Sequence, residues 1–120
     1  MERLDKIIAL RKHLHQIPEA SMHEVQTKKV LMQFLKENTD CFVVDKGDWF
    51  YAVRRATSEP TQPSIAFRAD MDAVCGADGK PGHYCGHDGH SSILCGVAMY
   101  LAEQNISLTR DVYLIFQPAE

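Results

Sequence analysis

The sequence predicts an α/β fold, because two apolar runs typical of buried strands lie on either side of an amphipathic helical pattern. The runs are at residues 64–68 and 111–116, and the helical pattern covers residues 88–104. A connection of this kind normally joins parallel strands. The 120 residues, 45% hydrophobic and 24% charged, match one ordinary globular domain. We therefore expect one strand-helix-strand unit whose strands are buried on both faces.

Two helices are predicted before the first strand. Leu4, Ile7 and Leu14 recur at helical spacing until Pro18 stops the pattern. A second apolar stripe, with lysines and glutamates opposite it, predicts another helix over residues 22–38.

A β-hairpin is expected next. Residues 41–44 and 49–53 are rich in β-branched and aromatic side chains, and residues 45–48 have the composition of a turn. Two prolines and a Ser/Thr run make residues 56–63 an exposed loop. The last strand, at residues 111–116, is expected to end at an exposed edge of an incomplete sheet.

Charge and hydropathy exclude several classes of partner. The net charge of −3 and the absence of a Lys/Arg cluster argue against nucleic-acid binding. No apolar run approaches the roughly 20 residues that span a bilayer, and the first six residues lack a secretory apolar region. We therefore expect a cytoplasmic protein without a membrane partner, in which the four cysteines stay reduced thiols.

Three potential metal ligands stand at the start of the helix predicted over residues 88–104. Cys85, His87 and His90 supply thiolate and imidazole donors, the ligand types that first-row transition metals prefer. The alternative is that the histidines are solvated loop residues and that Asp88 caps the helix. The sequence favours a metal site, with a structural role left open for Asp88.

Carboxylates follow two of the predicted strands. Asp70 and Asp72 come just past one strand, and Glu120 comes just past another. Ligands of open α/β sheets bind outside the carboxyl ends of the strands, so these side chains are expected to converge with the start of the helix. Turn residues are the alternative interpretation of the two aspartates.

The remaining cysteines and two of the histidines favour structural roles. Cys41, Cys75 and Cys95 are interpreted as small core or loop residues rather than ligands. His13 and His15 lie near the end of the first helix, where a positive charge suits the helix dipole.

Four motifs spread over nearly the whole chain resemble those of the M20 family of metallopeptidases. The resemblance is to the amidohydrolase branch, which includes hippurate hydrolases, indole-acetyl-amino-acid hydrolases and N-acetyldiaminopimelate deacetylases. It implies a partial zinc-peptidase-like three-layer sandwich and hydrolysis of the amide bond of an N-acyl amino acid or small peptide. The motifs are Leu-Arg-Lys-His-Leu-His-Gln-Ile-Pro-Glu at 10–19, Phe-Arg-Ala-Asp-Met-Asp-Ala at 67–73, Cys-Gly-His-Asp-Gly-His at 85–90 and Phe-Gln-Pro-Ala-Glu at 116–120.

The resemblance also implies roles for four residues. Cys85 and His87 match metal ligands of this branch. Asp72 matches a carboxylate that orients a residue of the metal site, and Glu120 matches the general base. The resemblance implies two divalent ions per complete site, zinc, manganese, nickel or cobalt, which lower the pKa of the water between them towards about 7.

Parts of the family pattern are missing from the sequence. In the family, the motif that includes Glu120 continues with a second glutamate ligand, followed by two histidine ligands and an inserted lid domain used for dimerisation. We therefore expect residues 1–120 to be the N-terminal part of a catalytic domain, without the lid, and to be inactive alone. The parent enzyme is expected to be a homodimer. Residues 74–82 also depart from the family pattern, which leaves the substrate preference open.

Two other functions stay open. A non-catalytic metal-binding or interaction domain derived from such a hydrolase would bind metal through Cys85 and His87 without turnover. Redox chemistry by Cys75 and Cys85 is less favoured, because the sequence contains no Cys-x-x-Cys motif.

Overall fold

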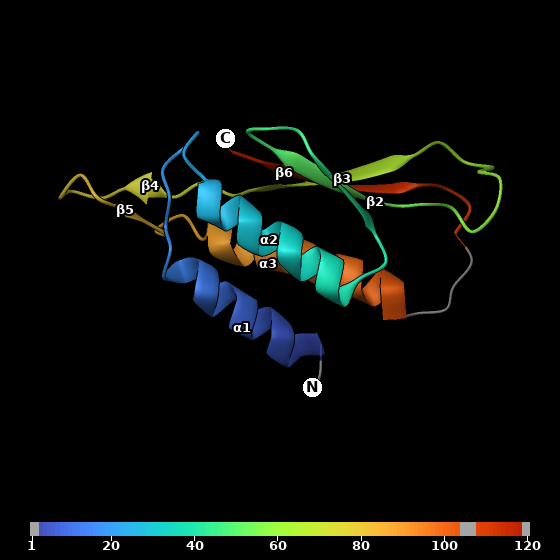
Figure 1. Ribbon diagram of the computed structural model, residues 1–120, viewed down its shortest axis with the longest axis horizontal. Helices are drawn as coiled ribbons and strands as arrows, with labels where there is room; N and C mark the ends of the chain where they lie inside the picture. The colour runs from blue at the N-terminus through green and yellow to red at the C-terminus, as the bar shows by residue number, and fades with distance from the viewer. Residues whose placement is uncertain (1–2, 104–107, 119–120) are drawn as a thin grey trace.

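Within residues 3–103 and 108–118, which the computed structural model describes, three helices and six strands form an α/β fold (Figure 1). The strands belong to a four-stranded sheet and a separate two-stranded hairpin. In chain order the elements are α1 (Arg3–His15), α2 (Val25–Asn38), β1 (Phe42–Asp45), β2 (Phe50–Arg54), β3 (Ile65–Asp70), β4 (Val74–Cys75), β5 (Pro81–Gly82), α3 (His87–Glu103) and β6 (Val112–Gln117).

The large sheet has the strand order β1-β2-β6-β3. The predicted hairpin is present as the antiparallel pair β1 and β2, and β6 continues the sheet antiparallel to β2. β3 pairs with β6 in parallel, from Ile65 opposite Val112 to Asp70 opposite Gln117, which confirms the strand-helix-strand prediction. Because β6 lies inside the sheet, the expectation that the last strand forms an edge is wrong, and β3 occupies that edge.

All three helices lie on the same side of the sheet (Figure 1). α2 and α3 pack on the strands, whereas α1 packs mainly on α3. The sheet and this helical side are two layers of the predicted three-layer sandwich, and none of the described helices covers the other side. In the part of the chain that the structure describes, no helix has the length and apolarity to cross a membrane.

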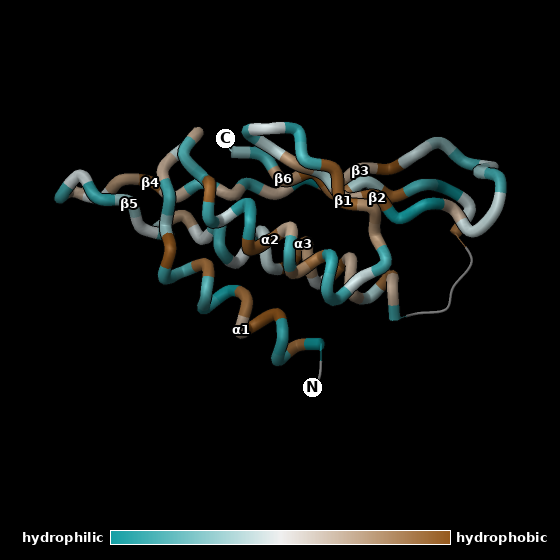
Figure 2. Tube along the Cα trace, in the orientation of Figure 1, coloured by the Kyte–Doolittle hydropathy of each residue, from teal (hydrophilic) through white to brown (hydrophobic). Residues whose placement is uncertain are grey.

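The core lies between the sheet and the helices. Phe50 and Phe116 are fully buried on adjacent strands, and their rings stack with centroids 4.6 Å apart. Leu31 of α2 and Cys95 of α3 cover them from the helical side and are also fully buried. Figure 2 shows that the strands in the centre are largely hydrophobic and that several turns around them are hydrophilic.

β3 is more exposed than the sequence predicted. Ile65 and Phe67 are 37% and 44% exposed, and burial begins only at Ala69. The apolar run was expected to be covered on both faces, but β3 is an edge strand of a sheet whose described helices lie on one side only. Pairing with β6 also extends β3 to Asp70, so this residue ends the strand instead of following it.

α2 begins three residues later than predicted, at Val25. Met22 has a positive φ of 70°, which is incompatible with a continuous right-handed helix through that position. The carboxylate of Glu19 accepts hydrogen bonds from the backbone N–H groups of Gln26 and Thr27, at 3.1 and 2.7 Å. Glu19 therefore satisfies two of the donors that every helix leaves unpaired in its first turn.

The β4–β5 hairpin was not predicted, because strands of two residues are too short to show an alternating pattern. Gly79 adopts a positive φ of 77° in its turn. The ring of Tyr84 lies against the hairpin so closely that a Cβ on Gly82 would be 2.5 Å from the ring. The hairpin lies between the end of β3 and the start of α3.

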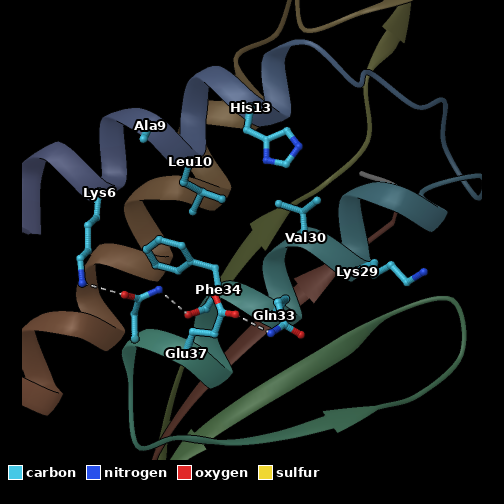
Figure 3. Close-up of a pocket in the computed structure, with 10 residues that line it drawn as sticks. Lys6, Ala9, Leu10, His13, Lys29, Val30, Gln33, Phe34 and Glu37 are labelled. Carbon is cyan, nitrogen blue, oxygen red and sulfur yellow. Dashed lines mark hydrogen bonds between the residues drawn. The ribbon is translucent and has the colours of Figure 1, made fainter.

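A groove of about 670 Å³ separates α1 from α2 (Figure 3). Its floor is apolar, with Leu10, Val30 and Phe34 pointing into it. One wall is closed by Lys6 Nζ, which donates a hydrogen bond of 3.0 Å to Asn38 Oδ1. The groove contains none of the candidate metal ligands.

The buried face of α2 is expected to carry a large share of the stability. Replacing the fully buried side chain in Leu31→Ala removes core contacts and leaves a cavity, so the free energy of unfolding should fall by about 2–5 kcal/mol. Val25→Ala, at a position 71% exposed on the same helix, should change it by less than about 0.5 kcal/mol. Urea unfolding followed by circular dichroism measures both, and equal effects would contradict the packing described above.

Candidate metal centre

The carboxyl ends of β3 and β6 meet the start of α3 at one edge of the sheet. Met71 N–H donates to Gln117 O at 2.9 Å, which extends the ladder beyond the strands. From α3, Ser91 Oγ donates to Asp70 O at 2.7 Å. The predicted convergence of these segments is therefore present, with Gln117 at the end of β6. Glu120, the predicted general base, lies outside the described residues.

His87 is the centre of this edge. Its Nδ1 lies 2.9 Å from the backbone oxygen of Asp72 and 3.0 Å from Asp72 Oδ1, and its Nε2 lies 3.6 Å from Asp70 Oδ2. All three side chains are buried. The hydrogen-bond partner of His87 Nδ1 is the backbone oxygen of Asp72, with the Asp72 carboxylate beside it. A backbone carbonyl or a carboxylate in this position fixes the tautomer and direction of a metal-binding imidazole.

The turn before α3 delivers His87 to this position. Gly86 has a positive φ of 79°, a conformation that favours glycine, and His90 N–H donates to Gly86 O at 3.0 Å to begin the helix. His87, directly after Gly86, is the first residue of α3. The Cys-x-His spacing therefore places a thiol in the exposed turn and an imidazole in the buried edge.

The donor set suits a divalent transition metal. His87 Nε2 and Asp70 Oδ2 are 3.6 Å apart, close to the roughly 3.4 Å between two ligands of one tetrahedral ion. Cys85 is exposed two residues earlier and adds a thiolate donor nearby in the chain. Within the described residues, however, no three His, Cys, Asp or Glu side chains are grouped closely enough to hold an ion. The described residues therefore fit part of a coordination sphere.

His90 lies beside this pair but is exposed. Its ring centroid is 6.2 Å from that of His87, and its Nδ1 accepts a hydrogen bond of 3.4 Å from the backbone of Asp70. His90 therefore borders the candidate centre. The metal-binding and catalytic roles of Cys85, His87 and Asp72 stay predictions.

The other three cysteines, interpreted as core or loop residues, differ in burial. Cys95 is fully buried in α3, and burial raises the pKa of its thiol. Cys41 is partly buried against the core, which also raises the pKa of its thiol. Cys75 is exposed in β4. Cys75 and Cys85 are therefore the exposed thiols among the four.

Asp88 has a larger role than the helix cap considered from the sequence. Its Oδ2 accepts a hydrogen bond of 2.8 Å from His15 Nδ1 and forms an ion pair with Arg11, 3.1 Å from Nε, although its side chain is only 1% exposed. Burial raises the pKa of Asp88, but the hydrogen bonds from His15 and Gly89 and nearby positive charge more than offset it, so the pKa lies below its usual value. From the sequence, His15 was explained by the dipole of its own helix, and this contact with Asp88 was not predicted.

Glu24 is a buried carboxyl that the sequence pattern did not reveal. It is 6% exposed, and its Oε2 has no hydrogen-bond partner among the described residues. Burial, together with the charges of Asp72 and Glu19, raises the pKa of Glu24 to about 7. The predicted helix over residues 22–38 had placed its glutamates on the solvent side. Only the later helix start, caused by the turn at Met22, brings Glu24 inside.

We expect the stability of the metal-free protein to depend on the ionisation of Glu24. The folded pKa of about 7 lies above the ordinary 4.5, so the folded state binds more protons and loses stability as pH rises between these values. Glu24→Gln cannot ionise and should therefore gain stability relative to wild type from pH 4.5 to pH 8, by at most about 3 kcal/mol. Urea unfolding at both values measures the gain, with the exposed Glu59→Gln as control. A difference independent of pH would contradict the interpretation.

Comparison with known proteins agrees with this geometry. Residues 66–120, which contain α3, β6 and all of β3 except its first residue, match the model of peptidase family M20/M25/M40. N-acetyl-L-cysteine deacetylase of Bacillus subtilis is 35% identical over 133 residues, which cover 96% of this chain and 30% of that protein. IAA-amino acid hydrolase ILR1-like 2 of Arabidopsis thaliana is 34% identical, over 99% of this chain and 29% of its own length.

A solved structure shows the same fold. The crystal structure of the Bacillus subtilis YXEP protein, described as a dinuclear metal binding peptidase from the M20 family, matches 97% of this chain with a TM-score of 0.85 at 32% identity. The match covers 35% of that structure, so the chain spans about a third of the length of these relatives. Motifs, fold and family model together show that the chain belongs to peptidase family M20/M25/M40.

Proposed function

We propose that the protein takes part in metal-dependent hydrolysis of the amide bond of N-acyl amino acids or small peptides. The observation that carries the proposal is His87, held by Asp72 on one side and facing Asp70 on the other, with the Cys85 thiol two residues before it. This pairing of thiolate, imidazole and carboxylate donors suits a hydrolytic metal centre. The named relatives act on N-acetyl-cysteine and on IAA-amino acids, which supports the substrate class.

Four residues would have distinct tasks in this reaction. A bound divalent ion would polarise the scissile carbonyl and acidify water. Cys85 and His87 would hold the ion, and Asp72 keeps His87 Nδ1 occupied so that the ring presents its other nitrogen. Glu120 would act as the general base that takes a proton from water and gives it to the leaving amine.

The chain would supply part of a larger enzyme. We propose that residues 1–120 correspond to the N-terminal part of a metallopeptidase catalytic domain and that the lid or dimerisation domain lies outside them. The proposal is supported by the coverage of about a third of the relatives' length and by the incomplete ligand group. The complete site would hold two ions, zinc, manganese, nickel or cobalt, in a homodimeric parent enzyme. A reducing cytoplasm would keep the exposed thiols of Cys75 and Cys85 available.

Selective protection of one thiol tests the metal site. In the apo protein a thiol-directed alkylating reagent should modify the exposed Cys75 and Cys85 and spare the buried Cys95. Saturating Zn²⁺ should slow modification of Cys85 at least 10-fold and leave Cys75 unchanged, as peptide mass spectrometry can show. Equal rates for Cys85 with and without Zn²⁺ would exclude it as a ligand.

Turnover tests the reaction itself. The protein isolated at the length that its own cells produce should hydrolyse an N-acetyl amino acid only when loaded with metal, and Cys85→Ser should reduce kcat at least 100-fold. Cys75→Ser, the exposed thiol outside the site, should keep wild-type kcat. Released amino acid is measured by chromatography. Zn²⁺ binding without turnover in that protein would instead support the non-catalytic metal-binding domain.

A further inference from the structure

Two consecutive residues at the start of α3 contact different parts of the protein. His87 reaches Asp72 and Asp70 at the end of β3. Asp88, the next residue, reaches Arg11 and His15 of α1. The same short stretch of backbone is therefore held on one side by the first helix and presents the candidate ligand on the other.

The contact between α1 and Asp88 is specific in geometry. A single oxygen, Asp88 Oδ2, accepts a hydrogen bond of 2.8 Å from His15 Nδ1 and lies 3.1 Å from Arg11 Nε in an ion pair. The second oxygen, Oδ1, accepts from Gly89 N–H at 2.9 Å. With both oxygens engaged and the side chain 1% exposed, the carboxylate has little freedom to turn.

The turn before Asp88 has few constraints of its own. Cys85 and Gly86 are both exposed, and Gly86 is the residue type that best tolerates alternative backbone conformations. The hydrogen bond from His90 N–H to Gly86 O begins the helix but does not tie it to the rest of the protein. The direction of Cys85 therefore depends on how firmly the first turn of α3 is fixed.

We propose that Arg11 and His15 are positioning residues for the metal centre, because their contacts with Asp88 fix the turn that presents Cys85 and His87. The inference rests on the metal site proposed above. It assigns to the first helix a task that its amphipathic pattern does not require, since Arg11 and His15 are half-exposed and contribute little to the core.

Cobalt binding tests this role, because thiolate ligation of Co²⁺ gives an absorption band that reports Cys85 directly. Arg11→Met and His15→Ala should each weaken Co²⁺ binding about 10–100-fold, the range found when groups that orient metal ligands are removed. His15→Asn places an amide donor near the position of Nδ1 and should recover most of the affinity. His13→Ala, at an exposed position of the same helix, should bind Co²⁺ as wild type does.

A variant that only weakens the fold separates positioning from stability. Leu10→Ala removes a buried side chain of α1 without touching Asp88 and should lower the thermal midpoint while keeping Co²⁺ affinity. Loss of affinity in Leu10→Ala as large as in His15→Ala would overturn the inference. So would wild-type affinity in both Arg11→Met and His15→Ala.

Hydrogen exchange without metal distinguishes this inference from the proposed function. The amide of His90, bonded to Gly86 O, should exchange at least 10-fold faster in His15→Ala than in wild type, with little change in Leu10→Ala. If wild type binds no Co²⁺, the metal site fails, and faster exchange would still show that α1 holds the turn. Unchanged exchange at His90 in His15→Ala would overturn the inference whatever the metal result.

Discussion

The parallel pairing of β3 with β6 is the constraint on which the candidate site depends. It sets Asp70 opposite Gln117, and the ladder continues through Met71 into the segment that carries Asp72. Parallel strands end at the same edge, so their carboxyl ends and the start of the connecting helix have to meet. A shift of this register by one residue would turn Asp70 to the opposite face of the sheet and separate it from His87.

The site concentrates buried carboxylates, which would be unfavourable without partners. Removing a charge from water costs several kcal/mol unless opposite charges or hydrogen bonds replace the lost hydration. Asp72 lies beside His87, and Asp88 is compensated by the guanidinium of Arg11 and the hydrogen bond from His15. Among the described residues, Glu24 Oε2 has no hydrogen-bond partner, and burial raises the pKa of this carboxyl. The contrast between Asp88 and Glu24 shows that the surroundings of each carboxyl decide whether burial favours its charged or its neutral form.

Most of the architecture follows from local patterns, and the exceptions have identifiable physical causes. Helical spacing and β-branched runs predict the helices and the main strands, and the Cys-x-His spacing locates the start of α3. The exposure of β3 could not be predicted, because burial depends on neighbours in the sheet and not on the apolarity of the strand itself. The link from Arg11 to Asp88 was equally hidden, since it joins segments far apart in the sequence. Glu24 changed sides because a single positive φ at Met22 moved the helix start.

The sheet topology combines contacts that are local in the sequence with contacts between distant segments. β1 and β2 are neighbours in sequence, and a β-hairpin of this kind forms in about 1–10 μs. β3 and β6 meet only after the whole of α3 has been spanned, and contacts of such long sequence separation form slowly. The edge where Asp70, His87 and Gln117 gather therefore does not exist until β3 and β6 have paired. The candidate centre thus depends on the slow, long-range contacts of the fold, whereas the β1–β2 hairpin depends on local ones.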